Sequence, residues 1–159
     1  MHTQSQGFTI LELLITVTVL GILVAVALPS FGNFVRDQRV KTAISDVYAT
    51  FIYARSEAIK RSADVQVIPN GADWAAGWTV KDSGGTSLKV QDAISGVAIS
   101  GEAGTITYRR DGRLSAAIAT FVLSSPDASS VTARCLRIDP SGRPNIRVDT
   151  NGDPADGCQ

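Results

Sequence analysis

The sequence predicts an α+β protein in which one long, bent N-terminal helix carries an antiparallel, two-sheet β head. Three observations support this fold class. After Glu12 no charged residue appears until Arg36. From Phe34 to Arg61 apolar residues recur at three- and four-residue spacing, as on one face of a helix. Beyond Ser62 the pattern changes to short alternating segments separated by Gly, Pro, Asn and Asp, which indicates antiparallel strands.

The first half of the predicted helix, residues 8–35, is long enough to span a membrane. Between Glu12 and Pro29 the only polar side chains are those of Thr16 and Thr18. At about 1.5 Å per residue, the uncharged run can cross a hydrocarbon core of roughly 30 Å. Because proline lacks an amide donor, we expect the helix to bend near Pro29.

The second half of the helix, residues 36–61, is predicted to be amphipathic and to pack on a globular head formed by residues 62–159. Its apolar stripe consists of Val40, Ile44, Val47, Phe51, Ala54 and Ala58. The strand candidates in the head are residues 64–68, 77–81, 87–91, 96–100, 105–109, 120–123, 133–138 and 145–148. Turns are expected at residues 82–85, 110–112 and 140–143, where glycine accompanies Asp, Ser or Arg. Trp74 and Trp78 are assigned to packing.

Three ordinary explanations of the N-terminal run compete with a more specific one. The first, a buried core helix, is not expected for a run of this length without charge. A secretory signal peptide would use the small residues 25–27 as a cleavage site, but residues 1–7 carry no Lys or Arg. A plain single-pass anchor leaves Glu12 unexplained, because a lone carboxylate in a membrane-length helix is costly and by default functional.

The segment Gly7-Phe8-Thr9-Ile10-Leu11-Glu12-Leu13-Leu14 resembles the class III signal of type IV prepilins and pseudopilins. This resemblance implies that residues 1–7 are a leader peptide, which a prepilin peptidase removes by cutting between Gly7 and Phe8. It also implies N-methylation of Phe8. The glutamate of the family then falls on Glu12, and its helix-breaking proline falls on Pro29.

A physical reason for the glutamate follows from this processing. Cleavage creates an amine on Phe8 next to lipid, and a carboxylate and an amine buried together cost far less than either alone. One helix does not easily fold Glu12 back on its own terminus, whereas a neighbouring helix shifted along the axis can supply the amine. We therefore interpret Glu12 as a residue that sets the register of assembly.

Motifs in the head are similar to those of the GspH/FimT group, which comprises minor pilins of type IV pili and minor pseudopilins of type II secretion. They lie at residues 53–58, 74–80, 106–112 and 134–143. The resemblance implies a structural minor pilin, built into a pilus near its tip, or alternatively a type II secretion pseudopilin. Its partners would be other pilins, the prepilin peptidase and methyltransferase, and inner-membrane lipid. The head would lie in the periplasm and later at the cell surface.

The two cysteines, Cys135 and Cys158, are too widely spaced for a CxxC redox motif. A cytosolic protein would keep them reduced, whereas a periplasmic or surface domain would pair them. A C-terminal bridge also resembles the pilin family.

The arginines of the head suggest a further alternative. Seven arginines and no lysine lie between residues 109 and 147. Arginine binds phosphate bidentately, so Arg134, Arg137, Arg143 and Arg147 are candidate DNA-binding residues. Some pilins of the FimT type are associated with DNA uptake through a Gly-Arg-x-Arg element, which Gly142-Arg143 matches in part. A solvated strand face or salt bridges between subunits would also explain these residues.

We expect neither an enzyme nor a cofactor. His2, the only histidine, lies in the predicted leader, and no nucleotide-binding loop is present. With 15 basic and 15 acidic residues, no global field directs the chain to nucleic acid. No metal site is expected, because the acidic tail at residues 149–156 lacks a complete calcium loop and is better explained as a polar turn.

Overall fold

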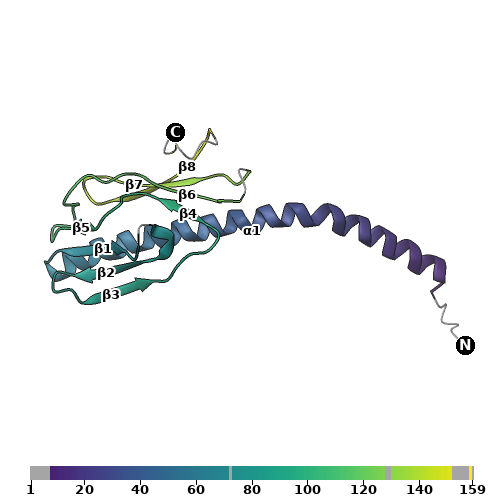
Figure 1. Ribbon diagram of the computed structural model, residues 1–159, viewed down its shortest axis with the longest axis horizontal. Coiled ribbons are helices and arrows are strands. Elements are labelled where there is room, and N and C mark those ends of the chain that lie inside the picture. The colour runs from purple at the N-terminus through teal and green to yellow at the C-terminus, as the bar shows by residue number, and fades with distance from the viewer. Residues whose placement is uncertain (1–7, 72, 128–129, 152–157, 159) are drawn as a thin grey trace, which may run out of the picture. The chain divides into compact units, whose positions relative to one another are not determined.

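The computed structural model describes residues 8–71, 73–127, 130–151 and 158. It contains a helix of 52 residues, α1 (Ile10–Arg61), followed by eight strands (Figure 1). The chain divides into two units, residues 1–35 and residues 36–159, and α1 contributes to both. The helix runs through Pro29 without interruption and ends at Arg61, where the sequence pattern places its end. The bend near Pro29 stays a prediction.

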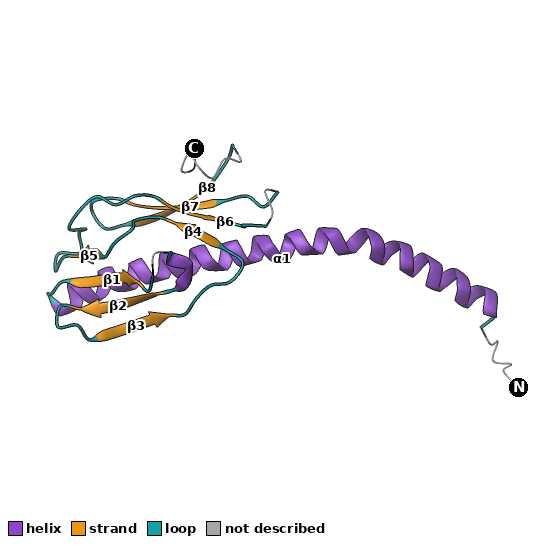
Figure 2. Cartoon of the chain, viewed as in Figure 1, coloured by secondary structure: helices purple, strands orange, loops and turns teal. Residues whose placement is uncertain are grey.

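The strands form two antiparallel sheets (Figure 2). One sheet has the order β3-β2-β1-β5 and the other has the order β4-β6-β7-β8. The strands are β1 (Val65–Pro69), β2 (Trp78–Asp82), β3 (Ser87–Gln91), β4 (Ala98–Ser100), β5 (Ile106–Tyr108), β6 (Phe121–Ser124), β7 (Arg134–Ile138) and β8 (Pro144–Val148). All eight expected strands are therefore confirmed, with shifts of one or two residues at some ends.

The second half of α1 supplies one wall of the core of the head. All six residues of its predicted apolar stripe are buried, and Phe51 lies at the centre of the aromatic contacts. The Phe51 ring centroid is 5.4 Å from that of Phe121 in one sheet and 6.4 Å from that of Tyr108 in the other. The helix thus joins both sheets through a single core, and the predicted packing of α1 on the head is confirmed.

The sequence did not predict a short 3-10 helix, η1 (Trp74–Ala76), between β1 and β2. The Asp73 side chain caps it by accepting a hydrogen bond from the Ala75 N–H, and Gly77 ends it with φ 89°. This helix directs Trp74 into the core, where its ring meets Phe121 edge to face at 4.9 Å. Trp78 is also buried, so the assignment of both tryptophans to packing is confirmed.

Candidate functional site

The N-terminal part of α1 is an exposed apolar surface. Every described residue from Phe8 to Ala27 is exposed, and Phe8 itself exposes 85% of its surface. An 18-residue window of the helix reaches a mean hydropathy of 2.6, which is enough by length and composition to cross a membrane. Apolar side chains surround the helix axis, as contact with lipid or with other helices requires. We call residues 8–27 the apolar segment.

Glu12 caps the N-terminal end of α1. Its Oε2 accepts a hydrogen bond from the Thr9 backbone N–H at 2.9 Å and another from the Thr9 hydroxyl at 3.0 Å. The Thr9 hydroxyl oxygen in turn accepts a bond from the Glu12 N–H at 3.2 Å. This reciprocal pattern is a capping box, which satisfies amide donors at a helix start.

The capping box adds a role for Glu12 within its own chain that we did not predict. Its carboxylate reaches back to Thr9, and the pairing of Glu12 with the Phe8 amine of a neighbouring subunit stays a prediction. The sequence signal was available, because Thr9-Ile10-Leu11-Glu12 matches the pattern of a threonine followed three residues later by glutamate. Gly7, on the other side of the predicted cleavage position, lies outside the described residues.

The predicted disulfide is present. Cys135 in β7 is bonded to Cys158 across 23 positions of sequence, with their Cα atoms 6.1 Å apart. Cys135 packs with Val122 and Ala133 in a small cluster separate from the main core. The bridge therefore attaches the C-terminal segment to the face of the β4-β6-β7-β8 sheet that points away from the helix.

The structure separates the four candidate arginines into two groups. In the β7–β8 register Cys135 faces Arg147 and Arg137 faces Asn145, so Arg137 and Arg147 share the outer face with Cys135. Arg143 is also exposed, at the turn that joins the two strands. Among the described residues, these three guanidinium groups have no carboxylate within 4 Å. We call Arg137, Arg143 and Arg147 the arginine row.

Arg134 lies on the opposite face of β7. Its side chain is 18% exposed, and its Nη2 is 3.8 Å from Oδ1 of Asp37 on α1. Its Nε is buried without a hydrogen-bond partner. The structure therefore brings Arg134 to the helix rather than to the arginine row.

The carboxylates near the arginine row act mainly as turn caps. Asp139 accepts hydrogen bonds from the Ser141 hydroxyl and from the Arg143 N–H. These donors, the hydroxyl first, lower the pKa of Asp139 below its ordinary value. Tyr108 lies beneath this turn, where burial raises the pKa of its phenol. Both groups keep their ordinary charge at neutral pH, so the turn combines the Asp139 carboxylate with the guanidinium of Arg143, whose positive charge also lowers the pKa of Asp139.

Among the described residues, no group of three or more His, Cys, Asp or Glu side chains is arranged to hold a metal ion. Asp149 is 3% exposed, and its Oδ1 accepts a hydrogen bond from the Asn151 N–H at 3.4 Å. The remaining acidic residues of the tail, Asp153 and Asp156, lie outside the described residues.

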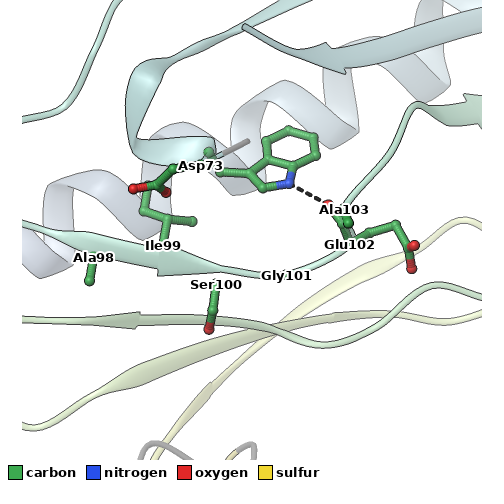
Figure 3. Close-up of a pocket in the computed structure, with 8 residues that line it drawn as sticks. Asp73, Ala98, Ile99, Ser100, Gly101, Glu102 and Ala103 are labelled. Carbon is green, nitrogen blue, oxygen red and sulfur yellow. Dashed lines mark hydrogen bonds between the residues drawn. The ribbon is translucent and has the colours of Figure 1, made fainter. Parts of the chain in front are cut away.

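A groove of about 410 Å³ lies beside β4 and η1 (Figure 3). Asp73 and Glu102 contribute the carboxylates of its lining, and the Glu102 carbonyl accepts a hydrogen bond from the Trp74 indole N–H at 2.6 Å. Both carboxylates already cap backbone groups, since Glu102 accepts a bond from the Ala119 N–H as Asp73 does from Ala75. We therefore assign the groove to local packing.

An exposed apolar helix joined to a two-sheet head with a C-terminal disulfide defines a pilin-like protein. The chain belongs to the family described as "Type II transport protein GspH", whose profile matches residues 43–142. A second profile, the prokaryotic N-terminal methylation motif, matches residues 3–28. The identification as a minor type IV pilin or GspH-like pseudopilin is thus confirmed at the level of the family.

Individual relatives agree with this family. A fimbrial protein of Pseudomonas aeruginosa is 29% identical over 125 residues, which cover 67% of this chain and 81% of that protein. The type IV major fimbrial protein FimA of Dichelobacter nodosus is 37% identical over 46 residues, 29% of this chain and 30% of that protein. The crystal structure of the P. aeruginosa type IV minor pilin FimU matches the fold with a TM-score of 0.62 at 20% identity, covering 79% of this chain and 99% of that one.

Proposed function

We propose that this chain is a minor subunit of a type IV pilus, inserted in the inner membrane by its apolar segment and then built into the filament near its tip. The exposure of the whole apolar segment carries the proposal, because an apolar surface of this extent needs lipid or other helices around it. The fimbrial relative that spans most of the chain supports a pilus. Gold labelling of a tagged head on sheared filaments tests the position at the tip.

In this proposal a prepilin peptidase cuts between Gly7 and Phe8, and the new amine on Phe8 is methylated. The match to the N-terminal methylation motif supports this processing. The head then lies in the periplasm. The disulfide supports that location, because an oxidising compartment maintains such bridges.

Glu12 has two roles in this account. Within its own chain it caps the helix through Thr9. In the filament its carboxylate pairs with the Phe8 amine of a neighbouring subunit, which offsets the cost of placing either charge in an apolar environment. The first role needs only a hydrogen-bond acceptor, whereas the second needs a negative charge.

Glu12→Gln separates these roles, because glutamine also serves in a capping box but carries no charge. We expect the variant to enter the membrane fraction like the wild type and to be depleted from sheared filaments. Thr9→Val is the matched control, since it removes the hydroxyl and keeps the carboxylate. Normal incorporation of Glu12→Gln, measured by quantitative immunoblotting, would show that the charge does not direct assembly.

A second candidate is a pseudopilin of type II secretion with the same architecture. The description of the matching family favours it. Deletion of the gene distinguishes the two: loss of surface pili with normal secretion supports the pilus, and the reverse result supports the secretion filament.

The arginine row favours a third candidate, a minor pilin that binds DNA during uptake. These three guanidinium groups are exposed and have no carboxylate within 4 Å among the described residues, so they can bind phosphates. We expect the full-length chain in detergent micelles to bind labelled duplex DNA, and Arg137→Gln combined with Arg147→Gln to weaken that binding. Absence of a salt-dependent shift with the wild-type chain would eliminate this candidate.

A further inference from the structure

Two turns of the head have the same pattern of backbone hydrogen bonds. The first, Arg109–Arg113, follows β5, and the second, Asp139–Arg143, joins β7 to β8. In each turn the N–H of the first residue donates to the carbonyl of the last, at 2.8 Å and 3.2 Å respectively. The glycine before the final arginine donates back to the carbonyl of the first residue, at 2.7 Å and 2.8 Å. We call these two segments the paired turns.

The paired turns touch each other although they come from different sheets. A Cβ atom at Gly142 would lie 2.1 Å from the Gly112 carbonyl oxygen, so this contact requires glycine. Both glycines also have positive φ, 76° at Gly112 and 80° at Gly142. The Tyr108 hydroxyl donates to the Gly142 carbonyl at 3.2 Å and ties the second turn to the end of β5.

Each touching glycine is followed by an arginine. Arg113 and Arg143 therefore leave the backbone from neighbouring positions, and both side chains are exposed. Arg109 and Arg110, at the start of the first turn, are exposed as well, and they line an open hollow with Asp64 and Asp111. One end of the head thus presents four arginines from two sheets.

The carboxylates beside these arginines bind backbone amides. Asp111 accepts from the Arg113 N–H at 3.0 Å, and Asp64 accepts from the Arg110 N–H at 3.2 Å. Asp139 does the same for Arg143 at 3.2 Å. Within the part of the chain that the structure describes, none of the four guanidinium groups has a carboxylate within 4 Å.

Guanidinium forks match the oxygens of a phosphate group, to which they donate two parallel hydrogen bonds. We propose that the paired turns are a phosphate-binding site for a polyanion, with Arg113 and Arg143 as its two central contacts. The site shares Arg143 with the arginine row. This inference therefore rests on the DNA-binding function proposed above and adds a further site to it. Arg113, in the first turn, belongs to neither the row nor the Gly-Arg-x-Arg element.

The test measures binding by the full-length chain in detergent micelles to two probes, labelled duplex DNA and labelled inorganic polyphosphate, over a range of salt concentrations. Arg113→Gln with Arg143→Gln removes both central contacts. Arg113→Lys with Arg143→Lys keeps the charge and loses the fork. Lys60→Gln with Lys81→Gln is the matched control, which removes the same charge from positions outside the paired turns.

For duplex DNA we expect the glutamine pair to lower the slope of log Kd against log salt by about 1.8, since each phosphate contact contributes about 0.9. The lysine pair should retain most of the slope with weaker affinity, and the control pair should behave like the wild type. An equal decrease of this slope in the glutamine pair and in the control pair would contradict the proposed site.

The two probes separate this inference from the DNA-binding candidate. If the wild type binds DNA and only Arg137→Gln combined with Arg147→Gln weakens that binding, the candidate function stands and the paired turns are not a phosphate-binding site. If polyphosphate binding depends on the paired turns and DNA does not bind, the site stands with another source of phosphate. Binding of neither probe would overturn both.

Discussion

The apolar segment and the head place similar side chains in opposite surroundings. In residues 8–27 the large apolar side chains are exposed, Leu20 for example by 60%. In the head, side chains such as Phe51, Val80 and Leu136 are fully buried, and every core residue lies at position 40 or later. The head thus contains its own core, whereas the side chains of the apolar segment are left exposed.

The largest expected effect contrasts one substitution in each region. Phe51→Ala removes the ring that joins both sheets and should lower the free energy of unfolding by about 3–5 kcal/mol. Leu20→Ala shortens a side chain that makes no core contact and should change it by less than about 0.5 kcal/mol. Urea unfolding of the full chain in detergent, followed by tryptophan fluorescence, measures both. A similar decrease in the free energy of unfolding in the two variants would contradict this difference between the head and the apolar segment.

The disulfide provides the next largest effect. Replacing Cys135 and Cys158 together by serine should lower the free energy of unfolding by about 3 kcal/mol, because the open chain gains entropy in the unfolded state. Wild-type protein treated with a reductant is the control and should unfold like the variant. Insertion into the membrane should be unaffected. An unchanged unfolding midpoint would mean that the bridge does not stabilise the head.

A smaller effect is expected with pH. Glu57 is buried near the end of α1, and its hydrogen bond from Arg61 is the main cause that lowers its pKa below the ordinary value. A lowered folded-state pKa stabilises the head above the ordinary pKa, and this contribution is lost as pH falls through the lowered value.

Glu57→Gln provides the control for this pH effect. The variant should be less stable than the wild type at neutral pH, and it should lose less stability between pH 5 and 3, a range spanning the ordinary glutamate pKa of about 4.3. An identical acid dependence of the two proteins would assign the loss to other carboxylates.

The sequence predicted the helix, the eight strands and the residues of the helix that face the core, because periods of 3.6 and 2 directly mark the buried faces. The sequence pattern does not predict the order of the strands in the sheets. β1 pairs with both β2 and β5, and the choice of β5 depends on contacts distant in sequence. The helix η1 depends on the cap at Asp73, a signal too short to stand out.

The site was only partly predictable. Residues three apart on a strand point to opposite faces, so the spacing of Arg134 and Arg137 already argued against a single basic surface. The capping role of Glu12 was also available from the spacing to Thr9. The contact between the paired turns was not, because Gly112 and Gly142 lie thirty positions apart and meet only through the two sheets.

Mass spectrometry of the N-terminus of the protein purified from cells tests the central claim most directly. We claim that the apolar segment becomes the beginning of the mature chain, so that a free amine stands close to Glu12 and can serve a neighbouring subunit. The predicted result is an N-methylated Phe8 as the first residue. A chain that retains Met1–Gly7, or one that begins at Leu28, would contradict the account.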